Sequence, residues 1–490
     1  MKPSGSMNYK EYWTMRQIRK NSRCYLGVLA ILFSLQACRV PQYAETELKP
    51  LEHYRNQVGV ADVDSSIAKV SYRDFFKDEL LVALLDSALA KNNDLRIALK
   101  QIEFAAQGYQ QAKWLQVPVI HANLANASIN RPSDNSMNGM MASQFMGQKY
   151  TTDYTSSIQL SWEADIWGKL RAQKQEALAD FLKTQEAARA IKTRLVAEVV
   201  RGYYNLLLLD RQLEITRSNL RLADSTFFIL NKQVELGLGN ILSAQQQEVA
   251  RDQINKQIPV IEANIQVQEN ALSILVGEVP GPIRRTTRLE KVQFPIGLSA
   301  GIPANLLSYR PDLRSCELDI RRSVASIHVA RSSMYPSLNI TAQGGLNAFK
   351  ASNWFNFPGA LFAAATGTLV QPILNGRRLK TQLEQSRIIK DQAELNFKQT
   401  MLKAVGEVSD ALVQLDKLDE QLETSDLQVE RSIKVVQHAL LLYKFNEASY
   451  LEVLVAQANK LQAELDQAAI KSQKIHAITS LYRALGGGWL

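Results

Sequence analysis

The pattern of hydrophobic and polar residues changes its period along the chain, and each period predicts a different element. Near residues 154–162 the apolar side chains of Ile158, Leu160 and Trp162 alternate with polar ones, and residues 338–343 repeat this alternation. Successive side chains of a β-strand point to opposite faces, so a period of two predicts strands with one apolar face. The sequence therefore predicts two pairs of strands, each pair joined by a loop.

A period of seven follows each strand pair and predicts two long helices. Apolar residues recur at this spacing in two series: Leu206, Leu213, Leu220, Phe227 and Val234, then Leu415, Leu422, Val429, Val436 and Tyr443. The intervening heptad positions include small or hydroxyl residues such as Ala223, Ser425 and Ser432, which suit helices packed side by side on a cylinder wall. A helix over residues 169–238 would extend for about 105 Å, far beyond a compact domain.

Turn residues predict that both long helices are followed by helices running in the opposite direction. Gly237, Gly239 and Asn446 are of the types that adopt the left-handed backbone conformation found at helix ends. We therefore expect descending helices over residues 241–275 and 450–485, so that each long helix begins a hairpin.

The chain is a tandem duplication. Asp94-Leu95-Arg96 matches Asp312-Leu313-Arg314 at a spacing of 218 residues, whereas Ile241-Leu242 matches Tyr450-Leu451 at a spacing of 209, so the first copy has about nine extra residues near 134–148. We place the first repeat at residues 75–290, with a helix over 80–113, strands at about 117–130 and 151–164, and a helical hairpin over 169–275. We place the second at residues 291–490, with a helix over 312–332, strands at about 336–347 and 358–373, and a hairpin over 377–485.

Residues 1–37 have the three parts of a secretion signal: basic residues, an apolar run from Tyr25 to Leu35, and small residues before Cys38. The segment Leu35-Gln36-Ala37-Cys38 resembles a lipobox, which predicts cleavage before Cys38 and acylation of that residue. An ordinary signal peptide with an incidental cysteine is the alternative. Residues 38–74 would then form a lipidated, extended segment. The long basic region leaves Met1, Met7 and Met15 as candidate start residues.

Charge and motif content exclude several functional classes. Removing residues 1–37, which contain six basic residues and one acidic residue, lowers the net charge from +9 to +4, so no electrostatic case for nucleic acid remains. The five histidines are scattered, and the sequence contains no nucleophile arrangement, phosphate loop or metal-ligand spacing. We therefore predict that the protein is not an enzyme and has no catalytic residue, cofactor or metal site.

Four methionines, Met137, Met140, Met141 and Met146, lie in the extra residues of the first repeat. Their thioethers are soft ligands of the kind that bind copper(I). The glycine and serine between them fix no geometry, however, so a flexible loop at the cell surface is the preferred interpretation.

Two strand pairs are too few to close a barrel, and an open sheet edge cannot lie in lipid, so a membrane-spanning chain of this kind must oligomerise. Four motifs, in this order along residues 75–489, resemble the signatures of the TolC-like outer membrane efflux proteins. They are Trp162 to Arg171 (WEADIWGKLR), Tyr309 to Arg314 (YRPDLR), Gln371 to Arg378 (QPILNGRR) and Leu481 to Trp489 (LYRALGGGW).

This resemblance implies a mainly α, tandem-repeat fold, in which a homotrimer forms a twelve-stranded β-barrel in the outer membrane and a twelve-helix α-barrel in the periplasm. The lipid-anchored channel would passively conduct drugs or other small molecules outward. Its helical tips would bind a periplasmic adaptor protein and, through it, an inner-membrane resistance-nodulation-division pump. The tip residues expected to contact the adaptor are Leu236, Gly237, Leu238, Ser243, Asn446, Glu447, Ser449, Tyr450 and Leu451.

One departure from the family pattern concerns the pore gate. Many relatives carry an aspartate one turn before the second tip, where this chain has Ala439-Leu440-Leu441-Leu442. The change favours a gate closed by apolar packing, with Leu440 and Tyr443 as candidates. Two other functions remain open: a protein-secretion conduit driven by an ATP-binding-cassette transporter, and a periplasmic coiled-coil scaffold without a pore. The strands argue against the scaffold, which needs only helices.

Overall fold

The computed structural model describes residues 70–294 and 309–489, so the expected signal peptide, Cys38 and most of the extended segment lie outside the described residues. Its contacts divide the chain into two compact units. The described part of the first unit consists of residues 105–181 and 318–394, and that of the second consists of residues 70–104, 182–294, 309–317 and 395–489.

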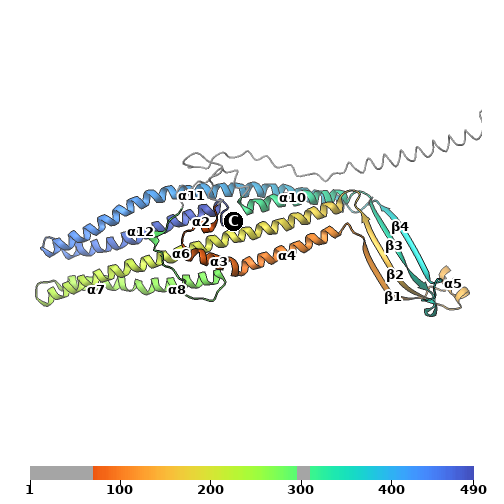
Figure 1. Ribbon diagram of the computed structural model, residues 1–490, viewed down its shortest axis with the longest axis horizontal. Helices are drawn as coiled ribbons and strands as arrows, with labels where there is room; N and C mark the ends of the chain where they lie inside the picture. Colours follow the sequence, from red (N-terminus) through yellow and green to blue (C-terminus); the bar gives the residue numbers. More distant parts are fainter. Residues whose placement is uncertain (1–69, 295–308, 490) are drawn as a thin grey trace, which may run out of the picture. The chain divides into compact units, whose positions relative to one another are not determined.

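The first unit contains one antiparallel sheet of four strands, β1 (Val119–Asn130), β2 (Thr151–Ala164), β3 (Ser337–Ala348) and β4 (Leu361–Val370) (Figure 1). The order β1-β2-β3-β4 leaves β1 and β4 at the two edges. Strands β2 and β3 come from different repeats and pair from Tyr154 opposite Ala348 to Ala164 opposite Leu338, which joins the repeats in one sheet. The strands begin and end within three residues of the ranges expected from the alternating pattern.

A ten-residue helix, α5 (Met137–Met146), lies in the β1–β2 connection, where we expected a flexible loop. The Ser136 side chain caps its first turn by accepting a hydrogen bond from the backbone N–H of Gly139 at 3.1 Å. Gly147, with φ of 64°, ends it in the left-handed conformation that favours glycine. The expectation of a flexible loop was therefore wrong: local capping orders this segment.

The first helix of each repeat differs from its expected extent. In place of one helix over 80–113, the structure has α3 (Glu79–Lys91) and α4 (Asn93–Trp114). Asn92 separates them because its side chain accepts a hydrogen bond from the Leu95 backbone at 2.9 Å and donates one to the Leu275 carbonyl at 2.8 Å. In the second repeat, α10 (Pro311–Ser332) begins at a proline, which is tolerated where no N–H partner exists.

The two long helices, α6 (Lys169–Glu235) and α11 (Arg378–Lys444), contain 67 residues each, and α6 ends three residues before the expected limit. Along the middle of α6 the intervening heptad positions are the more buried ones: Thr216, Ala223 and Leu230 are at most 2% exposed, whereas the large apolar Leu213 and Leu220 are half-buried. The small side chains of Thr216 and Ala223 let neighbouring helices approach closely, as expected from the sparse heptad filling.

The descending helices also differ between repeats. The helix expected over 241–275 is divided into α7 (Ile241–Asn255) and α8 (Gln257–Val276), because Pro259 cannot donate to the carbonyl of Asn255. The second, α12 (Tyr450–Ala484), is continuous. The remaining short elements are α2 (Tyr72–Phe75), η2 (Leu289–Lys291) and η4 (Ala351–Asn353).

Aromatic residues form the core of the second unit where its N- and C-terminal parts meet. The rings of Phe75 and Tyr482 stack with their centroids 4.3 Å apart, and Phe76 contacts both rings edge-on. Tyr203 and Tyr204 of α6 are also buried. Among the residues that the structure describes, no helix is both long and apolar enough to cross a membrane.

Candidate functional site at the helical tips

The α6–α7 and α11–α12 turns close with the same hydrogen-bond pattern. In the first turn the Gly237 N–H donates to the Val234 carbonyl at 3.0 Å and the Leu238 N–H donates to the Gln233 carbonyl at 2.8 Å. The second turn repeats these bonds, with Asn446 in the place of Gly237. Both residues have positive φ, 70° for Gly237 and 58° for Asn446. This is a Schellman cap, and asparagine can serve in place of glycine because it tolerates the left-handed conformation.

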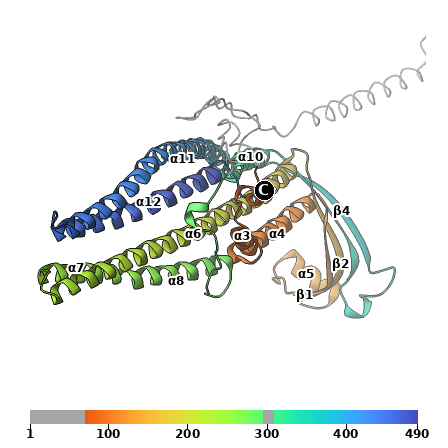
Figure 2. The ribbon, with the colours of Figure 1, turned by 60° about the vertical axis from the view of Figure 1, so that its left-hand side comes forward.

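Both turns expose apolar side chains and belong to the second unit, where the two hairpin ends lie side by side (Figures 1 and 2). Leu236, Leu238 and Leu451 are 71%, 80% and 57% exposed. The expected contact residues Glu447 and Ser449 are exposed as well, and Ser243 is half-exposed. The surface formed by these two turns, which we call the tip surface, therefore combines exposed leucines with a few polar groups, as a protein-binding surface does.

Tyr450, which we expected on the tip surface, is instead buried beneath it. Together with Leu230, Ala244 and Val453 it forms a small core shared by α6, α7 and α12. The candidate gate residues Leu440 and Tyr443 pack against this core, and the Tyr443 and Tyr450 rings meet at 5.7 Å in an edge-to-face arrangement. These three residues therefore support the tip surface from within.

A series of buried and partly buried polar contacts lies below the tips, within the first hairpin and between the two hairpins. The Tyr450 hydroxyl donates to the side-chain carbonyl of Gln247, and the amide of Gln247 donates to the Ala223 carbonyl at 2.8 Å. Tyr443 donates to Gln233 at 3.1 Å. Burial raises the pKa of both tyrosines, more strongly for Tyr450, so both hydroxyls remain protonated donors at neutral pH.

Further along the same helices, the buried Asn219 of α6 binds the ion pair of α12. Its amide donates to Glu464 at 2.7 Å, and its carbonyl accepts from Lys460 at 3.1 Å. The sequence patterns gave no sign of these bonds, because polar residues at single heptad positions are indistinguishable from surface residues until the partner helix is placed. Their presence fixes the register of α6 against α12.

We expect replacement of Tyr450 with phenylalanine to loosen the tip without unfolding the chain. The substitution leaves the buried side-chain oxygen of Gln247 without its donor, which costs about 1–2 kcal/mol. Hydrogen exchange of the amides in residues 236–247 and 441–453 should accelerate by about tenfold. The control is Tyr150→Phe, at an exposed tyrosine, which should leave these rates unchanged. Unchanged exchange in Tyr450→Phe would show that the bond contributes nothing.

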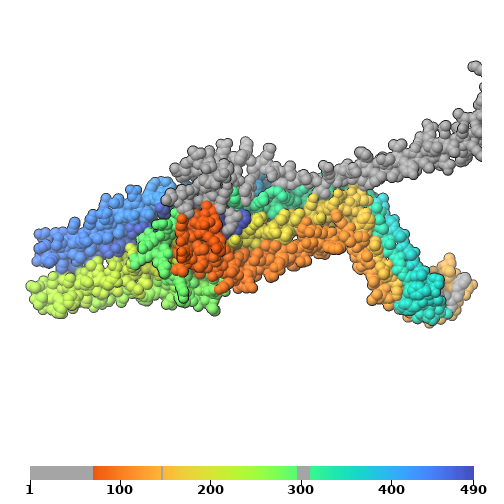
Figure 3. Space-filling model, viewed as in Figure 1, coloured from red at the N-terminus to blue at the C-terminus, as the bar shows by residue number. Residues whose placement is uncertain are grey.

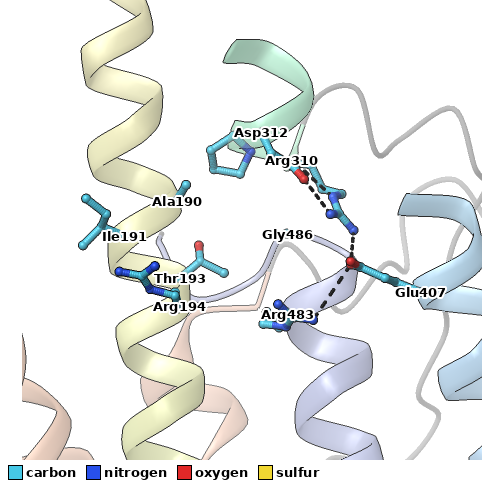
Figure 4. A pocket seen from close by; sticks show the side chains of 10 residues that line it. Ala190, Ile191, Thr193, Arg194, Arg310, Asp312, Glu407, Arg483 and Gly486 are labelled. Atoms are coloured by element: carbon cyan, nitrogen blue, oxygen red, sulfur yellow. Dashed lines mark hydrogen bonds and ion pairs between the residues drawn. The ribbon is translucent and has the colours of Figure 1, made fainter. Parts of the chain in front are cut away.

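A second polar cluster surrounds Arg310, the first of the two arginines of the YRPDLR motif (Figure 4). Its guanidinium donates to Asp312 at 2.6 and 3.0 Å, to Glu407 of α11 at 2.8 Å, and to the carbonyl of Ala484 at the end of α12 at 2.9 Å. Arg310 is only 8% exposed. The cluster therefore ties the start of α10 to both helices of the second hairpin.

The charges in this cluster stabilise each other. Burial by itself would lower the pKa of Arg310, but hydrogen bonds and the charges of Asp312 and Glu407 outweigh it and raise that pKa. Burial by itself would raise the pKa of Asp312, yet Arg310 holds that pKa below its usual value. Arg310 and Asp312 thus both stay ionised at neutral pH, and the arrangement is that of a structural clamp and not of a proton-transfer site.

The comparisons with known proteins agree with this architecture. The family model described as Outer membrane efflux protein matches residues 84–278 and 302–487. The cation efflux system protein CusC of Escherichia coli O6:H1 is 26% identical over 472 residues, which cover 96% of this chain and 99% of that protein. The toluene efflux pump outer membrane protein TtgC of Pseudomonas putida is 27% identical over 483 residues, covering 96% of each.

Among solved structures, a crystal structure of CusC, described in connection with transmembrane channel formation, superposes with a TM-score of 0.79. The two chains are 25% identical in that comparison, which covers 92% of this chain and 99% of the other. The tandem-repeat fold expected from the sequence motifs is thereby confirmed.

Proposed function

The chain belongs to the outer membrane efflux protein family, and from this premise we propose that it is the outer membrane channel of a tripartite efflux system. Three copies would enclose a pore that passively conducts drugs or other small molecules from a periplasmic adaptor and an inner-membrane pump to the exterior, without catalysing a reaction. The observation that carries the proposal is a four-stranded sheet with open edges in the same chain as two long helical hairpins. Relatives named for the efflux of cations and toluene support it.

Homotrimer formation is supported first by the sheet. Strands β1 and β4 are the ends of the described sheet and present unpaired backbone groups, which are not stable in lipid. If the β4 edge of one copy pairs with the β1 edge of the next, rotation closes the ring and removes every edge. Three copies would supply twelve strands, within the range found in outer membrane barrels.

Exposed apolar residues at heptad spacing support the same assembly along the helices. Each of these residues is more than half exposed: Ile97 and Phe104 in α4, Val260, Val267 and Ile274 in α8, and Ile388, Leu395 and Leu402 in α11. Helices α4 and α8 form part of the surface in Figure 3. A heptad series exposed on one chain indicates a missing partner helix. We assign that partner to a neighbouring copy of the chain.

Anchoring, docking and gating would each use a different part of the chain. Lipidation of Cys38 would attach the chain to the outer membrane, where several acyl chains on one residue anchor firmly. The tip surface would bind the adaptor. Leu440 and Tyr443, held by the core around Tyr450, would set the position of the α11–α12 hairpin where the pore closes.

The test is photo-crosslinking in intact cells, with a photoreactive residue at Ser243 or Ser449 on the tip surface and a control at the exposed Ser352 in the β3–β4 connection. We expect the tip positions, and not Ser352, to capture an adaptor protein together with a proton-driven pump. Capture of an ATP-driven exporter would move the function to protein secretion. If the tip positions capture neither an adaptor nor an exporter, and the protein purifies as a monomer without detergent, the proposal of a channel would be contradicted.

A further inference from the structure

The methionines of the chain are concentrated in one short element. Of nine methionines, four lie within the ten residues of α5, and three of the others, Met1, Met7 and Met15, precede the predicted cleavage site. The side chain of Met146 lies outside the described part of the structure. Met137, Met140 and Met141 are 72%, 57% and 52% exposed, although methionine usually fills gaps in cores.

The helix places these three thioethers on one face. Positions i, i+3 and i+4 of an α-helix are neighbours on its surface, with about 5–6 Å between their Cβ atoms. The opposite face of α5 packs against the rest of the β1–β2 connection, because Ala142 is 2% exposed and Gly139 is buried. A Cβ atom at Gly139 would clash with the Ser133 carbonyl oxygen, so the helix packs closely against Ser133 at this residue. The methionine face is therefore not needed to hold α5 in place.

The helix ends are fixed as well, so the spacing of the methionines is set. The Ser136 hydroxyl accepts from Gly139 at the start and donates to the Ser133 carbonyl at 2.7 Å, while left-handed Gly147 closes the other end. The glycine and serine between the methionines had favoured an irregular loop in the sequence analysis. Within the helix, Gly139 instead permits close packing against Ser133, so the helix fixes the positions from which the methionine side chains start.

We propose that Met137, Met140 and Met141 form a binding site for a soft monovalent metal cation, copper(I) or silver(I). Neutral thioethers bind such ions in preference to hard divalent cations. Each methionine has three rotatable bonds beyond its backbone, so three sulfur atoms starting at these spacings can converge on one ion. Within residues 70–294 and 309–489, no three His, Cys, Asp or Glu side chains gather in a metal-binding arrangement, so the thioethers alone define this site.

The test compares silver binding by the purified full-length protein and by the triple variant Met137→Leu/Met140→Leu/Met141→Leu. Leucine keeps the apolar volume and helix propensity but removes the sulfur atoms. Cysteine thiols, including Cys316, are first blocked with N-ethylmaleimide, and Ag⁺ is added in chloride-free buffer. Bound metal is counted by mass spectrometry after desalting. The matched control is Met334→Leu/Met401→Leu, which removes two half-buried methionines elsewhere.

We expect the triple variant to bind about one Ag⁺ per chain less than the wild-type protein, and the control to bind as much as wild type. Excess Zn²⁺ should not displace the silver. Equal binding by the triple variant, or displacement by Zn²⁺, would overturn the site and leave the face as an apolar contact surface. Circular dichroism checks that all variants are folded. Because the measurement needs no adaptor or pump, its outcome is independent of the proposed export function.

Discussion

Replacing Arg310 with methionine is expected to lower the free energy of unfolding by about 3 kcal/mol. The substitution keeps an apolar stem of similar length but removes four hydrogen bonds, three of them to carboxylates. Breaking a buried ion pair costs about 3–5 kcal/mol, and the lower value applies because Asp312 and Glu407 are 41% and 40% exposed and can regain water. Urea unfolding in detergent, followed by circular dichroism, measures the loss.

Arg314→Met is the matched control, one turn further along α10. The Arg314 side chain is 50% exposed and pairs with Glu317 at 3.4 Å, an arrangement worth less than about 1 kcal/mol. Arg310→Lys should fall between the two, because an ammonium cannot bind Asp312 through two parallel bonds and reach Glu407 as well. Similar stabilities for Arg310→Met and Arg314→Met would show that the cluster is not a clamp.

The double substitution Leu395→Asp/Leu402→Asp is expected to abolish assembly and, with it, export. Both leucines are exposed in the single chain, 65% and 63%, so aspartate costs little before association. Burial of each leucine at an interface between copies would contribute about 1.5–3 kcal/mol, so their loss weakens association by 100-fold or more. Size-exclusion chromatography of the detergent-solubilised protein reports the assembly, and retention of a dye in cells reports export.

A charge-matched control distinguishes the effect of the substituted positions from the effect of the added negative charge. Lys403→Asp alters the net charge by the same two units as the double substitution but lies beside Leu402, off the heptad series, at an exposed site. We expect this variant to assemble and export normally. A double variant that still assembles, or a control that fails equally, would mean that the exposed heptad residues are not the contact between copies.

Much of the fold could be predicted from the sequence because its elements are long and regular. The seven-residue period on α6 and α11 and the alternation on the strands each extend over enough residues for one interpretation to prevail. Gly237 and Asn446 marked the hairpin ends, since few residue types adopt positive φ. The breaks at Asn92 and Pro259 were missed because the apolar period continues across both.

The supporting contacts of the candidate site could not be predicted in the same way. Arg310 and Glu407 are 97 residues apart, and Tyr450 and Gln247 are 203 apart, so no local pattern connects them. Tyr450 looked like a surface residue because it directly follows a turn, whereas α7 and α12 pack there and bury it. Helix α5 was missed because a short, glycine-containing segment shows only a weak helical period of apolar residues. The helix is stabilised instead by its caps and by close packing at Gly139.

The open edges of the sheet also determine how a damaged gene would behave beside an intact one. The proposed ring of three would close only if every copy presents both edges, β1 and β4, so two intact subunits could not compensate for a third whose edge strand is disrupted. In a cell that makes intact and edge-damaged subunits equally, only about one ring in eight would contain three intact copies. Edge mutations should therefore be dominant, whereas mutations that unfold the whole chain, and so remove it from assembly, should be recessive.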